Sequence, residues 1–167
     1  GYYQRRLGVV VGLCFLADSA EIMLLSFLQS HVALEWDLTS TEVASISASV
    51  FAGELFGCYC WGSLGDQVGR RRTFLYATAM IAVFGFLSVF SSSYTMLVIC
   101  RTLVGFGVGG LSIPFALLAE TVTVSTRGVA LLNLEYFWML GSVYVAAVAW
   151  ASLNSLGWRF LAFACAL

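Results

Sequence analysis

The sequence has little charge and almost no proline. Charged residues make up 10% of the 167 residues, there is one proline and one histidine, and all eight basic residues are arginine. A soluble domain of this size carries more charge on its surface. Because 60% of the residues are hydrophobic, the composition indicates a membrane protein. The net charge of −1 gives no support to nucleic-acid binding.

Patterns typical of catalytic or metal-binding residues are also missing. The single histidine, His31, leaves no Ser/His/Asp set, and Cys58-Tyr59-Cys60 has one residue between the thiols where zinc and redox motifs have two. We interpret the five cysteines as small apolar packing residues. The sequence therefore predicts no enzyme, no metal and no cofactor.

Long apolar blocks dominate the chain. A helix needs about 20 apolar residues to cross a bilayer core. Five blocks have that length, at roughly 7–29, 43–62, 73–91, 96–119 and 128–151, and a sixth begins at 159 and stops at 167. Nine residues of helix rise only ~13 Å, less than half of the core. We therefore expect an all-α polytopic membrane protein with five full spans and the start of a sixth. We also expect the chain to be a fragment of a longer protein or the product of an incomplete gene model.

The arginines predict the orientation of the spans. The arginines that flank one set of span ends are Arg5, Arg6, Arg70, Arg71, Arg72 and Arg127. The positive-inside rule makes that side cytoplasmic. The N-terminus is therefore predicted to be cytoplasmic, and the loop with Glu35, Asp37 and Glu42 is predicted to lie outside.

Glycines in the fourth block predict close helix packing. Gly105, Gly107 and Gly110 match the G-x-G-x-x-G dinucleotide pattern, but they lie inside an apolar block and not between a strand and a helix. Gly105 and Gly109 also form a G-x-x-x-G pair, which is typical of tightly packed membrane helices. Pro114 removes a backbone hydrogen bond and favours a kink.

The connection between spans two and three has the most specific pattern of residues. It reads GSLGDQVGRRR from Gly62 to Arg72. Gly62, Gly65 and Gly69 favour a tight reversal, and Asp66 is placed to cap the next helix or to pair with an arginine. Without further information, a turn with a topology-setting charge cluster explains this pattern.

Four motifs in chain order resemble the major facilitator superfamily. They are G-x-L-x-D-x-x-G-R-R/K between spans two and three, Arg101-x-x-x-Gly105-x-Gly107, Glu120 with Arg127, and Gly157-Trp158-Arg159. Within that superfamily, LADSAEIM at 16–23 and EYFW at 135–138 resemble the synaptic vesicle 2-related and organic-ion transporter branch. One departure is Gln67, where many members carry a basic residue.

The resemblance implies a transporter with twelve helices in two halves, of which this chain supplies most of the first. Such folds surround a site near the bilayer midplane. The expected partners are the lipid bilayer, a small-molecule substrate and the missing C-terminal half. The expected location is the plasma membrane or an intracellular vesicle membrane. The resemblance also gives the residues at 66, 70, 71, 120 and 127 a role in a cytoplasmic latch, with topology alone as the alternative.

Five charged residues inside the spans are candidates for substrate or proton handling: Asp18, Glu21, Arg101, Glu54 and Glu135. A charge at the bilayer centre costs at least ~2.5–3.5 kcal/mol, so these groups are expected to face protein or water. Asp18 and Glu21 lie one helical turn apart, and Arg101 enters its span to a depth close to that of Glu21. An ion pair between Glu21 and Arg101 therefore fits the spacing. The structural alternative for each acid is a polar contact that fixes packing.

Two functions remain open at this point. The first is secondary transport of a small organic solute, with an organic ion and proton coupling among the options. The second is a vesicle-membrane regulator or scaffold that keeps the transporter fold without transport. The intramembrane acids favour the first.

Overall fold

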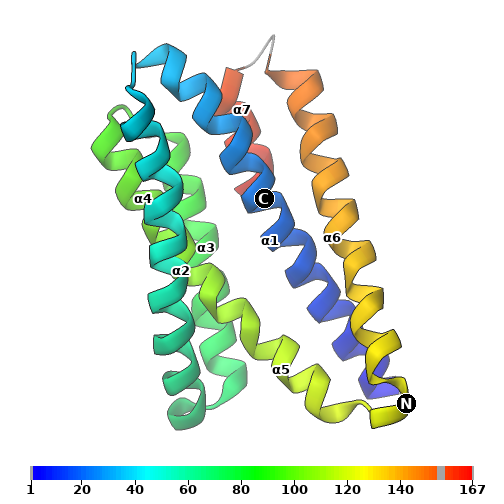
Figure 1. Ribbon diagram of the computed structural model, residues 1–167. Coiled ribbons are helices and arrows are strands. Elements are labelled where there is room, and N and C mark those ends of the chain that lie inside the picture. Colours follow the sequence, from blue (N-terminus) through cyan, green and yellow to red (C-terminus); the bar gives the residue numbers. More distant parts are fainter. Residues whose placement is uncertain (1, 154–156, 167) are drawn as a thin grey trace.

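The computed structural model describes residues 2–153 and 157–166, and this part of the chain is a bundle of helices. The α-helices are α1 (Tyr2–Glu35), α2 (Ser40–Val68), α3 (Arg70–Val89), α4 (Tyr94–Val108), α5 (Ser112–Thr121), α6 (Val124–Ser152) and α7 (Gly157–Ala166). A short 3-10 helix, η1 (Gly109–Leu111), joins α4 to α5. Figure 1 shows the long helices running roughly side by side, with the N-terminus at the lower end.

Five segments are long and apolar enough to cross a membrane: Arg6–Glu35, Ser40–Val68, Arg70–Val89, Tyr94–Thr121 and Thr126–Ser152. The helices run past most of the limits expected from hydropathy, because polar residues at the helix ends remain helical. The 34 residues of α1 rise ~51 Å, more than the ~30 Å thickness of the hydrocarbon core. Helix α1 is therefore longer than the apolar layer is thick.

Local capping residues set two helix starts. Thr39 and Glu42 form a capping box at the start of α2, in which each side chain binds the other's backbone N–H. The Ser93 hydroxyl accepts a hydrogen bond from the backbone N–H of Met96 at the start of α4. Both caps lie at the end of the bundle opposite the N-terminus (Figure 1).

The connection between α2 and α3 is shorter than the glycine-rich turn that the sequence predicted. The helix continues through Gly62, Gly65 and Asp66 to Val68, so the connection is Gly69 alone, with φ of 100°. That backbone conformation favours glycine. Asp66 does not cap the next helix, because Gly69 is the N-cap of α3 and makes no side-chain capping hydrogen bond. The motif is thus mostly the last turns of α2.

The fourth span changes direction in its middle. The 3-10 turn η1 precedes Pro114, which has no N–H to continue an α-helical ladder. In Figure 1, α5 runs away from the axis of α4 toward the start of α6. The chain therefore bends at η1, a few residues before the proline.

The helices form two closely packed pairs. Helix α2 packs along α4, and α1 packs along α6, whereas α1 makes few contacts with α2. The buried apolar residues of α1 belong to two clusters, one with Val11 and the other with Ala20, Leu24, Leu28 and Val32. Asp18 and Glu21 lie near the middle of α1, on either side of Ala20 in the sequence.

Candidate functional site

Glycines hold α2 against α4. A Cβ atom at Gly57 would come within 2.1 Å of the Phe106 carbonyl oxygen, and one at Gly105 within 2.2 Å of the Val50 carbonyl oxygen. Gly53 and Gly109 are equally crowded by the backbone of the facing helix. Real Cβ atoms do not approach backbone this closely, so only glycine allows this contact.

Neighbouring residues complete this packing. The indole Nε1 of Trp61 donates a hydrogen bond to the carbonyl oxygen of Phe106 (2.8 Å). Gly107 instead faces α3, where its Cβ would meet Ile81 at 2.7 Å, and Pro114 is buried. The spacing at Gly105 and Gly109 was visible in the sequence. The matching pair, Gly53 and Gly57, was overlooked, although both glycines stand four residues apart in an apolar block.

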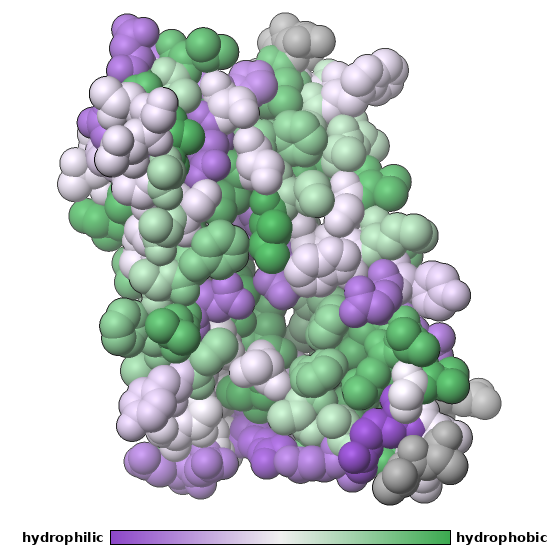
Figure 2. Space-filling model, in the orientation of Figure 1, coloured by the Kyte–Doolittle hydropathy of each residue, from purple (hydrophilic) through white to green (hydrophobic). Residues whose placement is uncertain are grey.

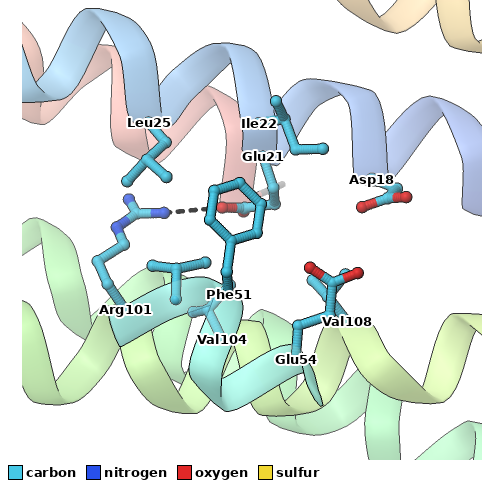
Figure 3. A pocket seen from close by; sticks show the side chains of 10 residues that line it. Asp18, Glu21, Ile22, Leu25, Phe51, Glu54, Arg101, Val104 and Val108 are labelled. Atoms are coloured by element: carbon cyan, nitrogen blue, oxygen red, sulfur yellow. Dashed lines mark hydrogen bonds and ion pairs between the residues drawn. The ribbon is translucent and has the colours of Figure 1, made fainter. Parts of the chain in front are cut away.

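A cavity lies between α1 and the α2–α4 pair. Four ionisable side chains line it, and all belong to the predicted set: Asp18 and Glu21 from α1, Glu54 from α2, and Arg101 from α4. Apolar side chains such as Phe51 and Val104 form the rest of the lining. Figure 3 shows Asp18 and Glu54 reaching toward one another from facing helices. The sequence-predicted acids therefore come together, with one exception.

Glu21 and Arg101 form the buried ion pair of this cavity. The Nη1 atom of Arg101 donates a hydrogen bond to Oε2 of Glu21 at 2.7 Å. The Arg101 side chain is 2% exposed and the Glu21 side chain is 13% exposed. The Nε and Nη2 atoms of Arg101 are buried and have no hydrogen-bond partner within the described residues. Losing one member of a buried pair typically costs 3–5 kcal/mol, because the other charge is left uncompensated. This pair is the charged link between α1 and α4.

A second compartment continues from the first. It is also lined by Asp18 and Glu54, together with Cys14, Cys58, Phe15 and Phe115, and it has a volume of about 210 Å³. The compartment around Arg101 is far smaller, about 20 Å³, which is room for about one water molecule. Figure 2 shows hollowed surface near the middle of this face, with hydrophilic side chains beside it.

Glu135 is the exception. It is exposed on α6 and is not among the residues that line either compartment. The buried side of α6 follows Leu134, Gly141, Val145 and Ala149, and Glu135 lies about 100° around the helix from Leu134. The structure therefore separates Glu135 from the other four charged residues.

Helix α1 is fixed to α6 by small and polar residues. The Ser19 hydroxyl donates to the carbonyl oxygen of Trp138 (2.7 Å) and lies 2.9 Å from the Ser142 hydroxyl. A Cβ at Gly141 would come within 2.4 Å of the Leu16 carbonyl oxygen. The face of α1 opposite these contacts can therefore present Asp18 and Glu21 to the cavity.

The arginine-rich ends of the helices lie together. The N-terminus, the α2–α3 turn and the start of α6 are at one end of the bundle (Figure 1). Arg70 makes a bidentate ion pair with Glu120 of α5 (2.9 and 3.2 Å), within this chain. The residues at 62, 65, 66 and 70 line a groove of about 350 Å³ beside α5. Arg71 and Arg127 are exposed in the first turns of α3 and α6.

At the opposite end of the bundle, α1 and α7 are joined by polar contacts that the sequence did not indicate. Glu35 of α1 forms an ion pair with Arg159 of α7 at 3.0 Å and accepts a hydrogen bond from the indole of Trp158. Trp158 packs edge-on against Trp36 with ring centroids 6.0 Å apart. Trp158 and Arg159 were noted only as part of a motif, and no local spacing links them to Glu35, more than 120 residues earlier.

Comparisons with known proteins agree with this fold. The chain is 37% identical over 161 residues to organic cation/carnitine transporter 7 of Arabidopsis thaliana and 36% identical over 161 residues to the synaptic vesicle 2-related protein of Bos taurus. Both alignments cover 96% of this chain but 32% and 29% of the relatives, so the chain spans about a third of their length.

Solved structures match the same architecture. The xylose transporter XylE from E. coli in an inward open conformation superposes with a TM-score of 0.80 at 20% identity, covering 98% of this chain and 45% of that one. Its structure with 6-bromo-6-deoxy-D-glucose, described as a proton:xylose symporter, gives 0.81 at 22% identity, with 98% and 42% covered. A family model, the Major Facilitator Superfamily, matches residues 10–167, and the chain therefore belongs to that superfamily.

Proposed function

We propose that the protein containing this chain carries out secondary active transport of a small organic solute by alternating access. The observation that carries this proposal is the buried pair of Glu21 and Arg101 beside Asp18 and Glu54. Four ionisable groups in the middle of a membrane bundle are costly for folding alone, and such residues mark substrate or ion pathways. The names of the plant transporter and the xylose symporter, both similar to this chain, favour the same class of function.

The ion pair would couple the contents of the cavity to helix movement. As a carboxylate, Glu21 attracts the guanidinium of Arg101 and links α1 to α4. A ligand group that draws the Arg101 guanidinium toward itself weakens that link, so α1 becomes free to move relative to the α2–α4 pair. Release of the ligand on the other side of the membrane restores the pair. The ion pair thus connects ligand binding with the arrangement of helices around the cavity.

The arginine-rich end would carry the cytoplasmic part of the mechanism. We assign this end to the cytoplasm on the positive-inside rule. The contact of Arg70 with Glu120 ties α3 to α5, and Asp66, Arg71 and Arg127 remain exposed for contact with the second half. Asp66→Asn in the full-length protein is expected to slow turnover while leaving substrate affinity nearly unchanged. Loss of expression and membrane insertion instead would favour a purely topological role.

Solute transport across liposome membranes tests the proposal. The full-length protein is reconstituted, and exchange of radiolabelled organic solutes is measured for the wild type, Asp18→Asn and Asp37→Asn. Asp37 is exposed in the α1–α2 turn, so its variant is a matched control. We expect Asp18→Asn to abolish flux and Asp37→Asn to preserve it. Equal flux in both variants would contradict the proposed role of Asp18.

The alternative is a membrane regulator or scaffold that has the fold without transport. It is favoured by similarity to the synaptic vesicle 2-related protein and to synaptic vesicle glycoprotein 2A of Rattus norvegicus, at 36% identity each. A folded full-length protein that exchanges none of a broad solute panel would support this alternative over transport.

A further inference from the structure

The arginines at the start of α3 point in different directions. Residues two apart in a helix lie about 200° apart around its axis, on nearly opposite sides. Arg70 reaches Glu120 of α5 and lines the groove beside that helix. Arg72 is exposed, and its guanidinium makes no hydrogen bond or ion pair with another described residue. Arg72 therefore carries an unneutralised charge on the side of α3 that faces away from the groove.

The side of α3 that carries Arg72 continues as an exposed apolar surface. Tyr76, one turn after Arg72, is 57% exposed, and Leu75, Val83 and Phe86 are exposed as well. The opposite side of α3 packs against α2, α4 and α7. Its buried residues are Thr73, Ala77, Gly85 and Ser88.

The exposed side of α3 is placed to contact lipid. Helix α3 is long and apolar enough to cross a membrane, and Arg70 is its one residue that lines the cavity, the second compartment or the groove beside α5. Gly107 of α4 faces Ile81 of α3, whereas Arg101 and Val104 of α4 face the cavity. Because the site of such folds lies between the two halves, the second half is expected on the cavity side of α4. The far side, with α3, is left to the bilayer.

Arg72 and Tyr76 lie at the depth of phospholipid headgroups. The 20 residues of α3 rise ~30 Å, the thickness of the hydrocarbon core, so the first turn emerges at one interface. Helical side chains lean toward the N-terminus of their helix, so the Tyr76 ring extends toward Arg72. A guanidinium binds phosphate in bidentate fashion, and a tyrosine hydroxyl donates one further hydrogen bond. The Tyr76 hydroxyl makes no hydrogen bond with another described residue.

We infer that Arg72 and Tyr76 form a binding site for an anionic phospholipid, with its phosphate on these two side chains and its acyl chains along Leu75, Val83 and Phe86. Charge complementarity selects this occupant. The arginine-rich end, which we assign to the cytoplasm, meets the leaflet that carries the anionic lipids. A zwitterionic phospholipid offers the same phosphate, but its ammonium group cancels the charge that Arg72 attracts. The site lies outside the cavity and does not depend on the transported solute.

A comparison of two lipids tests the site. Purified full-length protein in detergent is titrated with dioctanoyl phosphatidylglycerol and with dioctanoyl phosphatidylcholine, and the apparent Kd of each is taken from the rise in melting temperature. The two lipids share their chains and phosphate and differ in net charge. We expect phosphatidylglycerol to bind about 5-fold more tightly, the effect of one arginine at a membrane surface.

Variants assign the preference to its residues. Arg72→Gln should remove the preference for phosphatidylglycerol. Tyr76→Phe should weaken the binding of both lipids by about 2- to 5-fold, because both have the phosphate that its hydroxyl contacts. Arg127→Gln is the matched control, since it removes the same charge from an exposed arginine at the same end of the bundle, where Leu131 and not a tyrosine follows one turn later. This control should keep the wild-type preference.

Three outcomes would overturn the inference. Equal affinity of the wild type for the two lipids, which needs no variant to fold, would mean that Arg72 selects no anionic headgroup. An equal loss of preference in Arg72→Gln and Arg127→Gln would mean that overall charge attracts the lipid without a defined site. If glycerol phosphate, which has no acyl chains, raises the melting temperature as much as phosphatidylglycerol does, the occupant is a soluble phosphate and not a lipid.

Discussion

The two sides of α2 and α4 show opposite ways of joining membrane helices. Against each other, these helices meet through glycines so closely that backbone touches backbone, as at Gly57 and Gly105. Toward α1 they present charges, including Glu54 and Arg101, and enclose a cavity. Dispersion contacts in the first interface depend on a fixed shape, whereas charges in the second respond to protons and ligands. The bundle therefore combines a rigid contact with an adjustable one, and the following experiments separate the two.

A large loss of stability is expected for Gly57→Ala, which tests the rigid interface. The added Cβ would meet the Phe106 carbonyl oxygen at 2.1 Å, so α2 and α4 have to move apart, at a cost of about 1–3 kcal/mol or more. Gly62→Ala in the same helix is the control, because nothing lies within 4 Å of its Cβ. The melting temperature of the purified protein should fall strongly for Gly57→Ala and stay unchanged for Gly62→Ala. Equal melting temperatures for the two variants would mean that the glycine contact between α2 and α4 is loose.

Arg101→Met tests the adjustable interface. Glu21 would be left buried without its cation, which is expected to destabilise the protein by about 3–5 kcal/mol. Replacing both Glu21 and Arg101 with Met should recover much of this stability, because no buried charge then lacks its partner. Both proteins should lack transport. The melting temperature reports the structural role of the ion pair, and solute flux reports its role in transport. A double variant as unstable as Arg101→Met would contradict the ion-pair explanation.

Ser19→Ala probes how α1 is attached to its own partner. The variant loses the hydrogen bond to the Trp138 carbonyl and the contact with Ser142. Such bonds in membranes average about 0.6 kcal/mol, so the melting temperature should fall slightly and solute flux should persist. Gly141→Ala, which would clash with the Leu16 carbonyl oxygen, should lower the melting temperature more. The reverse order would place the α1–α6 attachment in the hydroxyls and not in the close approach.

The smallest effect on stability is expected for Arg70→Gln and Glu120→Gln. This ion pair is exposed, and exposed pairs contribute little because water and salt screen them. Melting should be unchanged within error, while turnover in liposomes should slow if the contact changes during transport. Unchanged turnover in both variants would limit Arg70 and Glu120 to setting topology.

The sequence predicted the fold well because long apolar blocks and a run of family motifs agree. It also placed Glu21 and Arg101 at similar depths, so that an ion pair between them fitted the spacing, because helical rise alone sets depth. It did not exclude Glu135, because rotation around a helix depends on which neighbour that helix packs against. The ion pair and hydrogen bond that join Glu35 to α7 were not predicted for a related reason. Contacts between distant helices follow from packing, which no local pattern of residues encodes.

The reversal at Gly69 shows a further limit. A string of glycines was expected to form a loop, but α2 remains helical to Val68. In a membrane bundle, backbone groups are best satisfied within a helix, and this outweighs the modest cost of glycine in a helix interior. Only the residue with positive φ breaks the ladder.

The glycine contact between α2 and α4 also restricts how this protein can vary. Every other amino acid carries a Cβ, so each missense change at Gly53, Gly57, Gly105 or Gly109 puts an atom where backbone already lies. Conservative replacement, which softens mutations elsewhere, does not exist at these positions. Natural variants should therefore be depleted at these four sites and tolerated at Gly62 and Gly128, which have open space beside them. A survey of allelic variation would detect this contact without any structure.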